Sequence, residues 1–116
     1  MTENKATIER YMAAFRVTDH AVILSCLTDD VVWDIPGMSY SQGKAAFEKE
    51  IDNDAFVGHP DIVVTRMIEE DDVVVAEGSV RTWKRDGGEM SLRFCDVFLM
   101  QAGKIRQLTS YLTDFK

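Results

Sequence analysis

Apolar residues in the first half of the chain recur at the three- and four-residue spacing that is typical of amphipathic helices. The first helix is predicted over residues 2–18. Its apolar stripe consists of Ile8, Tyr11, Met12 and Phe15. A second helix is predicted over residues 20–27, with Asp19 as its N-cap, because a carboxylate there can accept a hydrogen bond from the first turn. A third helix is predicted over residues 44–51.

The segments beside the third helix are less regular. Residues 31–35, Val-Val-Trp-Asp-Ile, are typical of a short strand, and the Pro-Gly pair at residues 36–37 ends it. Residues 38–43 are predicted to be a loop. Residues 52–60 are expected to be the least regular and a mobile part of the chain, since they combine Asn, Gly and Pro.

From residue 61 onward the pattern is that of strands, rich in β-branched and aromatic residues and interrupted by turn-forming residues. The four runs are residues 62–68, 73–83, 90–100 and 105–112. Their connections are too short for helical crossovers, so the runs are predicted to pair as antiparallel neighbours. The sequence therefore predicts one α+β domain over residues 1–116, in which three N-terminal helices cover a curved antiparallel sheet and enclose a pocket.

The length, composition and charge of the chain limit the classes of protein to which it can belong. With 116 residues and 46% hydrophobic content, the chain has room for a single core. A net charge of −7 argues against binding to nucleic acid, which requires clustered basic residues. No apolar run approaches the ~20 residues of a membrane span, and residues 1–5 lack the features of a secretory signal. We expect a cytoplasmic protein whose two cysteines, Cys26 and Cys95, are reduced.

Neither a metal site nor a cofactor is expected from the motifs. The histidines, His20 and His59, are far apart, and no Cys/His pair has the spacing of metal ligands. No local signature of a Ser–His or Cys–His nucleophile occurs, and no glycine-rich loop is present to hold a phosphate.

Asp96 is the residue that most directly suggests chemistry. It shares one face of a predicted strand with Phe94 and Phe98, because side chains alternate along a strand. An ionised carboxylate is expensive to bury there, so the acid is expected either to keep its proton and donate a hydrogen bond or to find a partner. Contact with solvent, an arginine or a backbone donor is the alternative interpretation.

Other residues are predicted to surround Asp96. Tyr11 lies on the apolar stripe of the first helix, either as a second hydrogen-bond donor or as a core aromatic whose hydroxyl reaches solvent. Ser110 faces inward if its strand neighbours Leu108 and Leu112 do, although a serine in a strand is often inert. The predicted lining of the site is Trp33, Ile35, Phe94, Phe98, Ser110 and Leu112.

The whole chain resembles the nuclear-transport-factor-2-like superfamily, and within it the SnoaL-like group, which includes polyketide cyclases. The resemblance rests on the order of the helices, the strand that ends in Pro36-Gly37, the segment Phe-Cys-Asp-Val-Phe at residues 94–98, and Gly-Lys-Ile at residues 103–105. It implies a cone-shaped fold that carries enzymes, binding modules and association domains alike.

One comparison within the superfamily is sharper. Residues 10–12, Arg-Tyr-Met, are similar to the helix that carries the catalytic tyrosine of ketosteroid isomerases, and residues 95–97, Cys-Asp-Val, resemble the strand that carries their neutral aspartic acid. In those enzymes the pair donates hydrogen bonds to an oxyanion, which implies catalytic roles for Tyr11 and Asp96. Their proton-shuttling base corresponds to Ile35, which cannot carry a proton, so steroid isomerase activity is not expected.

Two further relatives bear on function. Limonene-epoxide-hydrolase relatives activate water with an Arg and two Asp residues, and Ser110 stands at one of these acidic positions, so that chemistry is not expected here. In SnoaL-like cyclases the central residue is an acid on the third long strand, which Asp96 matches. The resemblance thus implies acid/base or oxyanion-stabilising chemistry on an apolar, carbonyl-bearing substrate.

Two alternatives to an enzyme remain. The domain could hold a small apolar ligand without turning it over, or it could serve to dimerise. Members of the superfamily often pair through the outer face of the sheet, where this chain offers Cys95, Val97 and Leu99. A homodimer is expected under every hypothesis.

Overall fold

The computed structural model describes residues 2–52 and 56–114, and within them three helices precede or interrupt the first strands. The helices are α1 (Glu3–Arg16), α2 (His20–Ser25) and α3 (Lys44–Ile51). Thr2 caps α1 by accepting a hydrogen bond from the backbone of Lys5. Asp19 caps α2 in the same way, which confirms the predicted N-cap.

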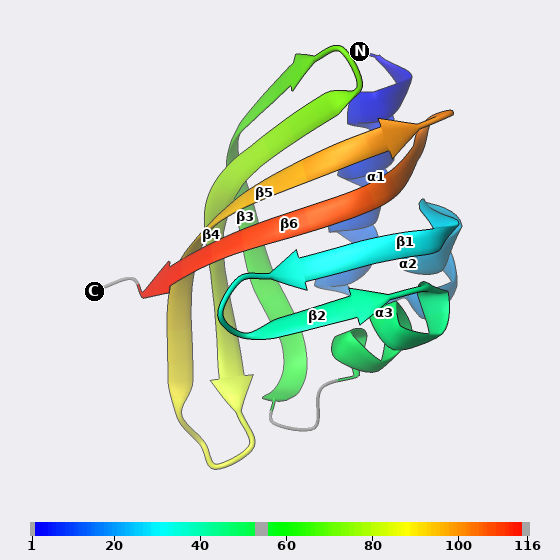
Figure 1. Cartoon of the computed structure of the whole chain (residues 1–116). Coiled ribbons are helices and arrows are strands. Elements are labelled where there is room, and N and C mark those ends of the chain that lie inside the picture. Colours follow the sequence, from blue (N-terminus) through cyan, green and yellow to red (C-terminus); the bar gives the residue numbers. More distant parts are fainter. Residues whose placement is uncertain (1, 53–55, 115–116) are drawn as a thin grey trace.

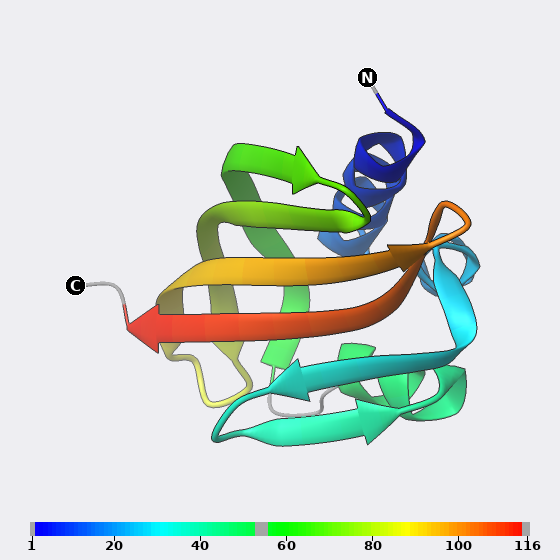
Figure 2. The ribbon, with the colours of Figure 1, turned by 45° about the horizontal axis from the view of Figure 1, so that its top comes forward.

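The described strands form one six-stranded sheet in the order β2-β1-β6-β5-β4-β3. They are β1 (Leu27–Ile35), β2 (Ser39–Gln42), β3 (Phe56–Glu70), β4 (Val73–Lys84), β5 (Glu89–Gln101) and β6 (Lys104–Asp114). The three helices lie on one side of this curved sheet (Figure 1 and Figure 2). The α+β class and the cone-shaped arrangement of the prediction are confirmed.

A glycine allows the long strands to bend around the helices. Gly78 lies in the middle of β4, opposite Val64 on β3 and Phe94 on β5. A Cβ atom at position 78 would lie 1.9 Å from the carbonyl oxygen of Val63 and 2.9 Å from the Phe94 ring. The adjoining pairing of β3 with β4 is irregular between Val64 and Arg66, as expected where a bulge increases curvature.

The hydrophobic core fills one end of the space between the helices and the sheet. It combines residues of α1, α2 and α3, the start of β1, and the concave faces of the long strands. Its completely buried large side chains include Ile8, Ile23, Leu27, Phe47, Phe98, Ile105 and Leu108. A cavity occupies the other end of that space.

Three details differ from the prediction. Residues 39–42, predicted as loop, form strand β2 because they pair with residues 32–35 of β1 across a turn. The second helix ends at Ser25 rather than residue 27, and β1 begins at Leu27 rather than residue 31, because Leu27 pairs with Ile105 of β6. A pairing distant in sequence decided both boundaries.

The edge strand and the sense of one pair also differ from expectation. β3 begins at Phe56, within the stretch predicted to be irregular, and it tolerates Pro60 because an edge strand leaves one side unpaired. Residues 53–55 of that stretch lie outside the described residues. The sheet is antiparallel except that β1 runs parallel to β6, which the meander of four strands did not predict.

Candidate functional site

A cavity of about 840 Å³ opens between the helices and the concave face of the sheet. Its wall is formed by residues of α1, of the end of α3, and of all six strands. Most of the lining side chains are apolar. Such a space is large enough for a small organic molecule.

Asp96 lies on β5, directly opposite Ala76 of β4 and Ser110 of β6. The residue is only 9% exposed. Burial disfavours the charged carboxylate and raises the pKa of Asp96 from 3.8 to about 7, while a hydrogen bond from Ser110 acts in the opposite direction. No salt bridge to Asp96 is present among the described residues. The carboxyl can therefore hold or release a proton near neutral pH.

Ser110 connects Asp96 to an indole. The Nε1–H of Trp33 donates to the hydroxyl oxygen of Ser110 at 3.0 Å. Because the serine oxygen accepts this bond, its own proton is free to point toward Asp96. The indole is held by Phe47, on which it stacks at 4.5 Å, and by an edge contact with Phe15 at 6.1 Å.

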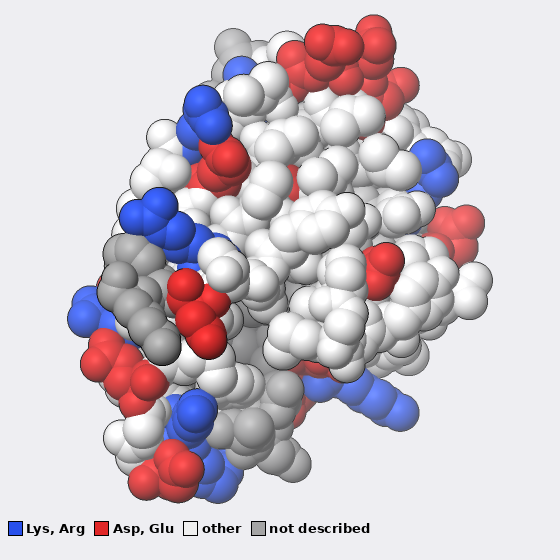
Figure 3. Space-filling view, turned by 60° about the vertical axis from the view of Figure 1, so that its left-hand side comes forward, with Lys and Arg blue, Asp and Glu red and all other residues white. Residues whose placement is uncertain are grey.

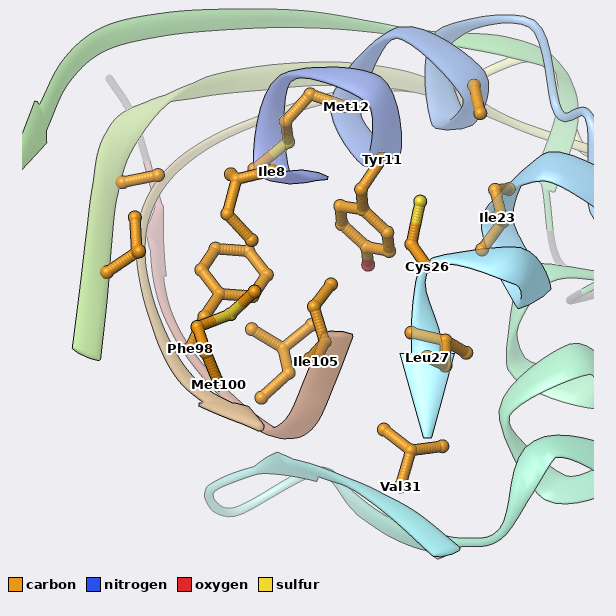
Figure 4. Close-up of a cluster of buried hydrophobic side chains, with 14 of the residues drawn as sticks. Ile8, Tyr11, Met12, Ile23, Cys26, Leu27, Val31, Phe98, Met100 and Ile105 are labelled. Atoms are coloured by element: carbon orange, nitrogen blue, oxygen red, sulfur yellow. The ribbon is translucent and has the colours of Figure 1, made fainter. Parts of the chain in front are cut away.

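Tyr11 enters the site from α1 and is 3% exposed. Figure 4 shows its side chain extending from the helix between Phe98 and Cys26. Burial, followed by the nearby Asp96 carboxylate, raises the pKa of the Tyr11 phenol well above its ordinary value. The phenol is therefore a neutral hydrogen-bond donor, close enough to Asp96 for the two groups to interact electrostatically.

The structure brings together all but one of the residues predicted from the sequence. Asp96, Tyr11 and Ser110 line the cavity, as do Trp33, Ile35, Phe94 and Leu112. Phe98 does not: it is completely buried in the core and packs against the Tyr11 ring at 5.7 Å. The reason is that α1 covers this part of β5, so the strand passes from cavity to core between positions 96 and 98.

Sequence analysis missed six polar residues of the described lining, which are Thr18, Ser39, Glu50, Asp52, Thr82 and Arg85. Glu50 and Asp52 lie at the end of α3, and Arg85 follows β4 in a turn, so no periodic pattern marked them. Thr82 could have been found, because it shares the concave face of β4 with Ala76 and Val80 by strict alternation.

Two further observations concern the described part of the chain. It contains no cluster of three or more His, Cys, Asp or Glu side chains suited to a metal ion. None of its helices combines the length and apolar character that a membrane crossing requires.

A protein-family model matches most of this chain. A model of the SnoaL-like domain matches residues 8–108. The chain belongs to the SnoaL-like domain family. This SnoaL-like domain has no match among curated proteins.

Solved structures share the architecture of this SnoaL-like domain at low sequence identity. An NTF2-like protein of unknown function from Burkholderia pseudomallei is 19% identical, with a TM-score of 0.88 over 97% of this chain and 92% of its own. An LEH-like epoxide hydrolase of M. tuberculosis is 18% identical, with a TM-score of 0.84 over 96% and 83%. A candidate SnoaL-like polyketide cyclase from Shewanella putrefaciens is 10% identical, with a TM-score of 0.85 over 97% and 90%. Such identities establish a common fold and leave the reaction open.

Proposed function

We propose that this SnoaL-like domain is a small-molecule enzyme that transfers a proton to, or stabilises an oxyanion on, an apolar carbonyl-bearing substrate during cyclisation or isomerisation. The observation that carries the proposal is the Asp96 carboxyl, buried at 9% exposure in the wall of an apolar cavity with a pKa near 7. A group of this kind is matched to proton transfer at neutral pH.

The side chains around Asp96 have distinct roles in this proposal. Protonated Asp96 donates to the substrate carbonyl oxygen as negative charge develops on it, and Tyr11 supplies a second donor. Ser110, oriented by Trp33, stabilises the carboxylate that remains after the proton has left. Ile35 packs against the substrate instead of serving as a base.

The test combines titration with turnover. We expect carbon-detected NMR to give Asp96 a pKa near 7, and a screen of enones and epoxides to find a substrate whose turnover Asp96→Asn abolishes. Asp34→Asn is the matched control, because Asp34 lies on β1 opposite Thr109, on the outer face of the sheet. An Asp96 pKa near the ordinary value of about 3.9 contradicts the proposal.

A binding protein without catalysis is the second candidate, and Ile35 at the position of the isomerase base favours it. Native mass spectrometry of the purified protein would then find an apolar molecule bound. If Asp96→Asn removes turnover of a substrate while its affinity is unchanged, the protein is an enzyme and the second candidate fails.

We further propose that the domain is a cytoplasmic homodimer that pairs through the outer face of its sheet. Val97 and Leu99 of β5 and the half-exposed Tyr111 of β6 lie on this face. Figure 3 shows a largely uncharged area across its middle, with charged side chains around all its margins and a few within the right-hand half. In this proposal the free thiols of Cys26 and Cys95 stay reduced.

A further inference from the structure

Four aromatic side chains of α1, β1 and α3 make a closed cycle of ring contacts. From α1, Tyr11 packs against Phe15, with 5.7 Å between the ring centroids, and Phe15 packs against Trp33 at 6.1 Å. From α3, Phe47 lies 4.5 Å from the Trp33 ring and 6.4 Å from the Tyr11 ring. Tyr11 and Trp33 carry hydrogen-bond donors, whereas the two phenylalanines have none. The phenylalanines therefore act on the site only through packing.

The two phenylalanines differ in what they can touch. Phe15 lines the cavity. Phe47 is completely buried and is not among the described residues of the lining. Its contact with Trp33 is also the closest of the four, with the two ring planes only 26° apart. A substrate in the cavity would contact Phe15, while Phe47 acts on the site through the rings that it touches.

Backbone hydrogen bonds hold Phe47 in register with the strand that carries Trp33. The N–H of Gly43, at the start of α3, donates to the carbonyl oxygen of Val31 on β1 at 2.7 Å. The N–H of Phe47 donates in turn to the carbonyl oxygen of Gly43 at 3.0 Å. The first turn of α3 is thus attached to β1, so the stacked rings cannot easily shift past each other.

The plane of the indole matters because of where its N–H group points. Nε1 of Trp33 lies off the bond about which the indole turns, and it donates to the hydroxyl oxygen of Ser110 at 3.0 Å. Rotation of the indole would swing the N–H away from this oxygen, and such bonds weaken steeply below an angle of about 120°. Ser110 also forms the hydrogen bond to the carboxyl of Asp96.

We propose that Phe47 is a positioning residue that fixes the plane of the Trp33 indole without contact with the substrate. Through Ser110, this plane determines how strongly the carboxylate of Asp96 is stabilised. Tyr11 has two further ring contacts and depends less on Phe47. The inference rests on the proposed function for the role of Asp96 in catalysis, whereas the hold on the indole can be measured without a substrate.

Solvent exchange of the indole proton tests this hold. Phe47→Met keeps most of the volume of the side chain and removes the ring. We expect NMR to show roughly two- to tenfold faster exchange of the Trp33 Nε1 proton, the value of one aromatic pair. The indole of Trp83, near the end of β4, is the reference in the same spectrum and should not change. Phe47→Leu, which also lacks the ring, should give the same result.

A core variant distinguishes this effect from a general loss of stability. Ile105 is completely buried at the start of β6 and is not aromatic. Ile105→Val removes one methyl group from the same core and should leave the exchange of both indole protons unchanged. Unchanged exchange of the Trp33 proton in both Phe47 variants, or equally fast exchange in Ile105→Val, overturns the inference.

A double-mutant cycle tests whether Phe47 acts through Trp33. By carbon-detected NMR, Phe47→Met should raise the pKa of Asp96, by less than the roughly one pH unit expected when the Ser110 hydroxyl is removed. In a Trp33→Phe background the same substitution should leave that pKa unchanged. An equal change in the two backgrounds, zero included, overturns the inference. The proposed function fails on a different result, an ordinary pKa of Asp96 in the wild type.

Discussion

Asp96 lowers the stability of the folded chain at neutral and alkaline pH, because its carboxyl must release a proton inside an apolar cavity. Below pH 3.8 the acid is protonated in the folded and the unfolded chain alike. As the pH rises from about 4 to 7, the unfolded chain loses this proton while the folded chain keeps it. The free energy of unfolding therefore falls over this interval and levels off above it.

This fall of the free energy of unfolding with rising pH should disappear when Asp96 can no longer be charged. Asp96→Asn keeps the shape of the side chain and removes the charge, so it should raise the free energy of unfolding at pH 8. The separation between 3.8 and about 7 corresponds to an upper bound on the order of 4 kcal/mol, at about 1.4 kcal/mol per pH unit. Urea unfolding at pH 4.5 and pH 8 measures the difference in the free energy of unfolding between the variant and the wild type. Asp34→Asn should behave as the wild type, and equal pH dependence in wild type and Asp96→Asn would contradict the assignment.

Ser110 sets how far the pKa of Asp96 rises. Ser110→Ala removes the hydrogen bond to the carboxylate and should raise the pKa of Asp96 by about one further pH unit. Trp33→Phe leaves the serine in place and removes only the indole donor, so its effect should be smaller. Carbon-detected NMR titration of Asp96 provides the measurement. A pKa that falls or stays constant in Ser110→Ala would show that the serine does not stabilise the charge.

At the scale of elements, the bend of β4 depends on Gly78. An alanine there would place its Cβ atom against the carbonyl of Val63, which belongs to the backbone and cannot move aside. We expect Gly78→Ala to destabilise the protein by about 2 kcal/mol or more, in a thermal or urea unfolding experiment. Gly88→Ala is the control with a small effect, because its new neighbours are the flexible side chains of Asp86 and Lys84. Equal stability of the two variants would refute the steric argument.

His20 joins α2 to the end of α3. Its two ring nitrogens lie 2.9 Å from Glu48 and 2.9 Å from Asp52. The hydrogen bond with Glu48, supported by Asp52, raises the pKa of His20 above its ordinary value. Protonated His20 therefore stabilises the fold fully below about pH 6.5, and this contribution is lost as the pH rises through the higher pKa of the folded chain.

The matching prediction uses His20→Gln, which cannot be charged. The variant should lose the part of the pH dependence that lies above about pH 6.5 and keep the part that Asp96 causes below pH 7. Unfolding curves of both His20→Gln and the double variant with Asp96→Asn separate the two contributions. Wild-type behaviour of His20→Gln above pH 6.5 would show that the bridge does not act on stability.

At the scale of the whole molecule, the proposed homodimer depends on the outer face of the sheet. Tyr111 is 53% exposed there, which is costly for a large aromatic side chain that has no cover. We expect light scattering to find a dimer at micromolar concentration, and Tyr111→Lys to shift it to a monomer. Val17→Lys changes an equally exposed apolar residue at the end of α1 and should leave the dimer intact. A monomeric wild type would refute this pairing.

The chemistry predicted around Asp96 could be read from the chain because alternation along a strand is strict. Positions 94 and 96 share a face whatever the rest of the fold does, and an acid beside phenylalanines indicates burial. Alternation could not show where along β5 the cavity ends and the core begins. Phe98 shares the same face, yet the covering helix α1 turns its surroundings into core.

Periodicity also determined the three helices and the four long strands, because each pattern reflects which face of an element avoids water. It could not determine β2, whose short polar segment becomes a strand by pairing across a turn with β1, or the start of β1, where Leu27 pairs with the distant Ile105. The same limit applies to the site: Tyr11, Trp33 and Asp96 line one cavity only because the sheet curls around the helices. Local pattern decided the elements and the unusual acid, while long-range packing decided the volume of the cavity and the pKa of Asp96.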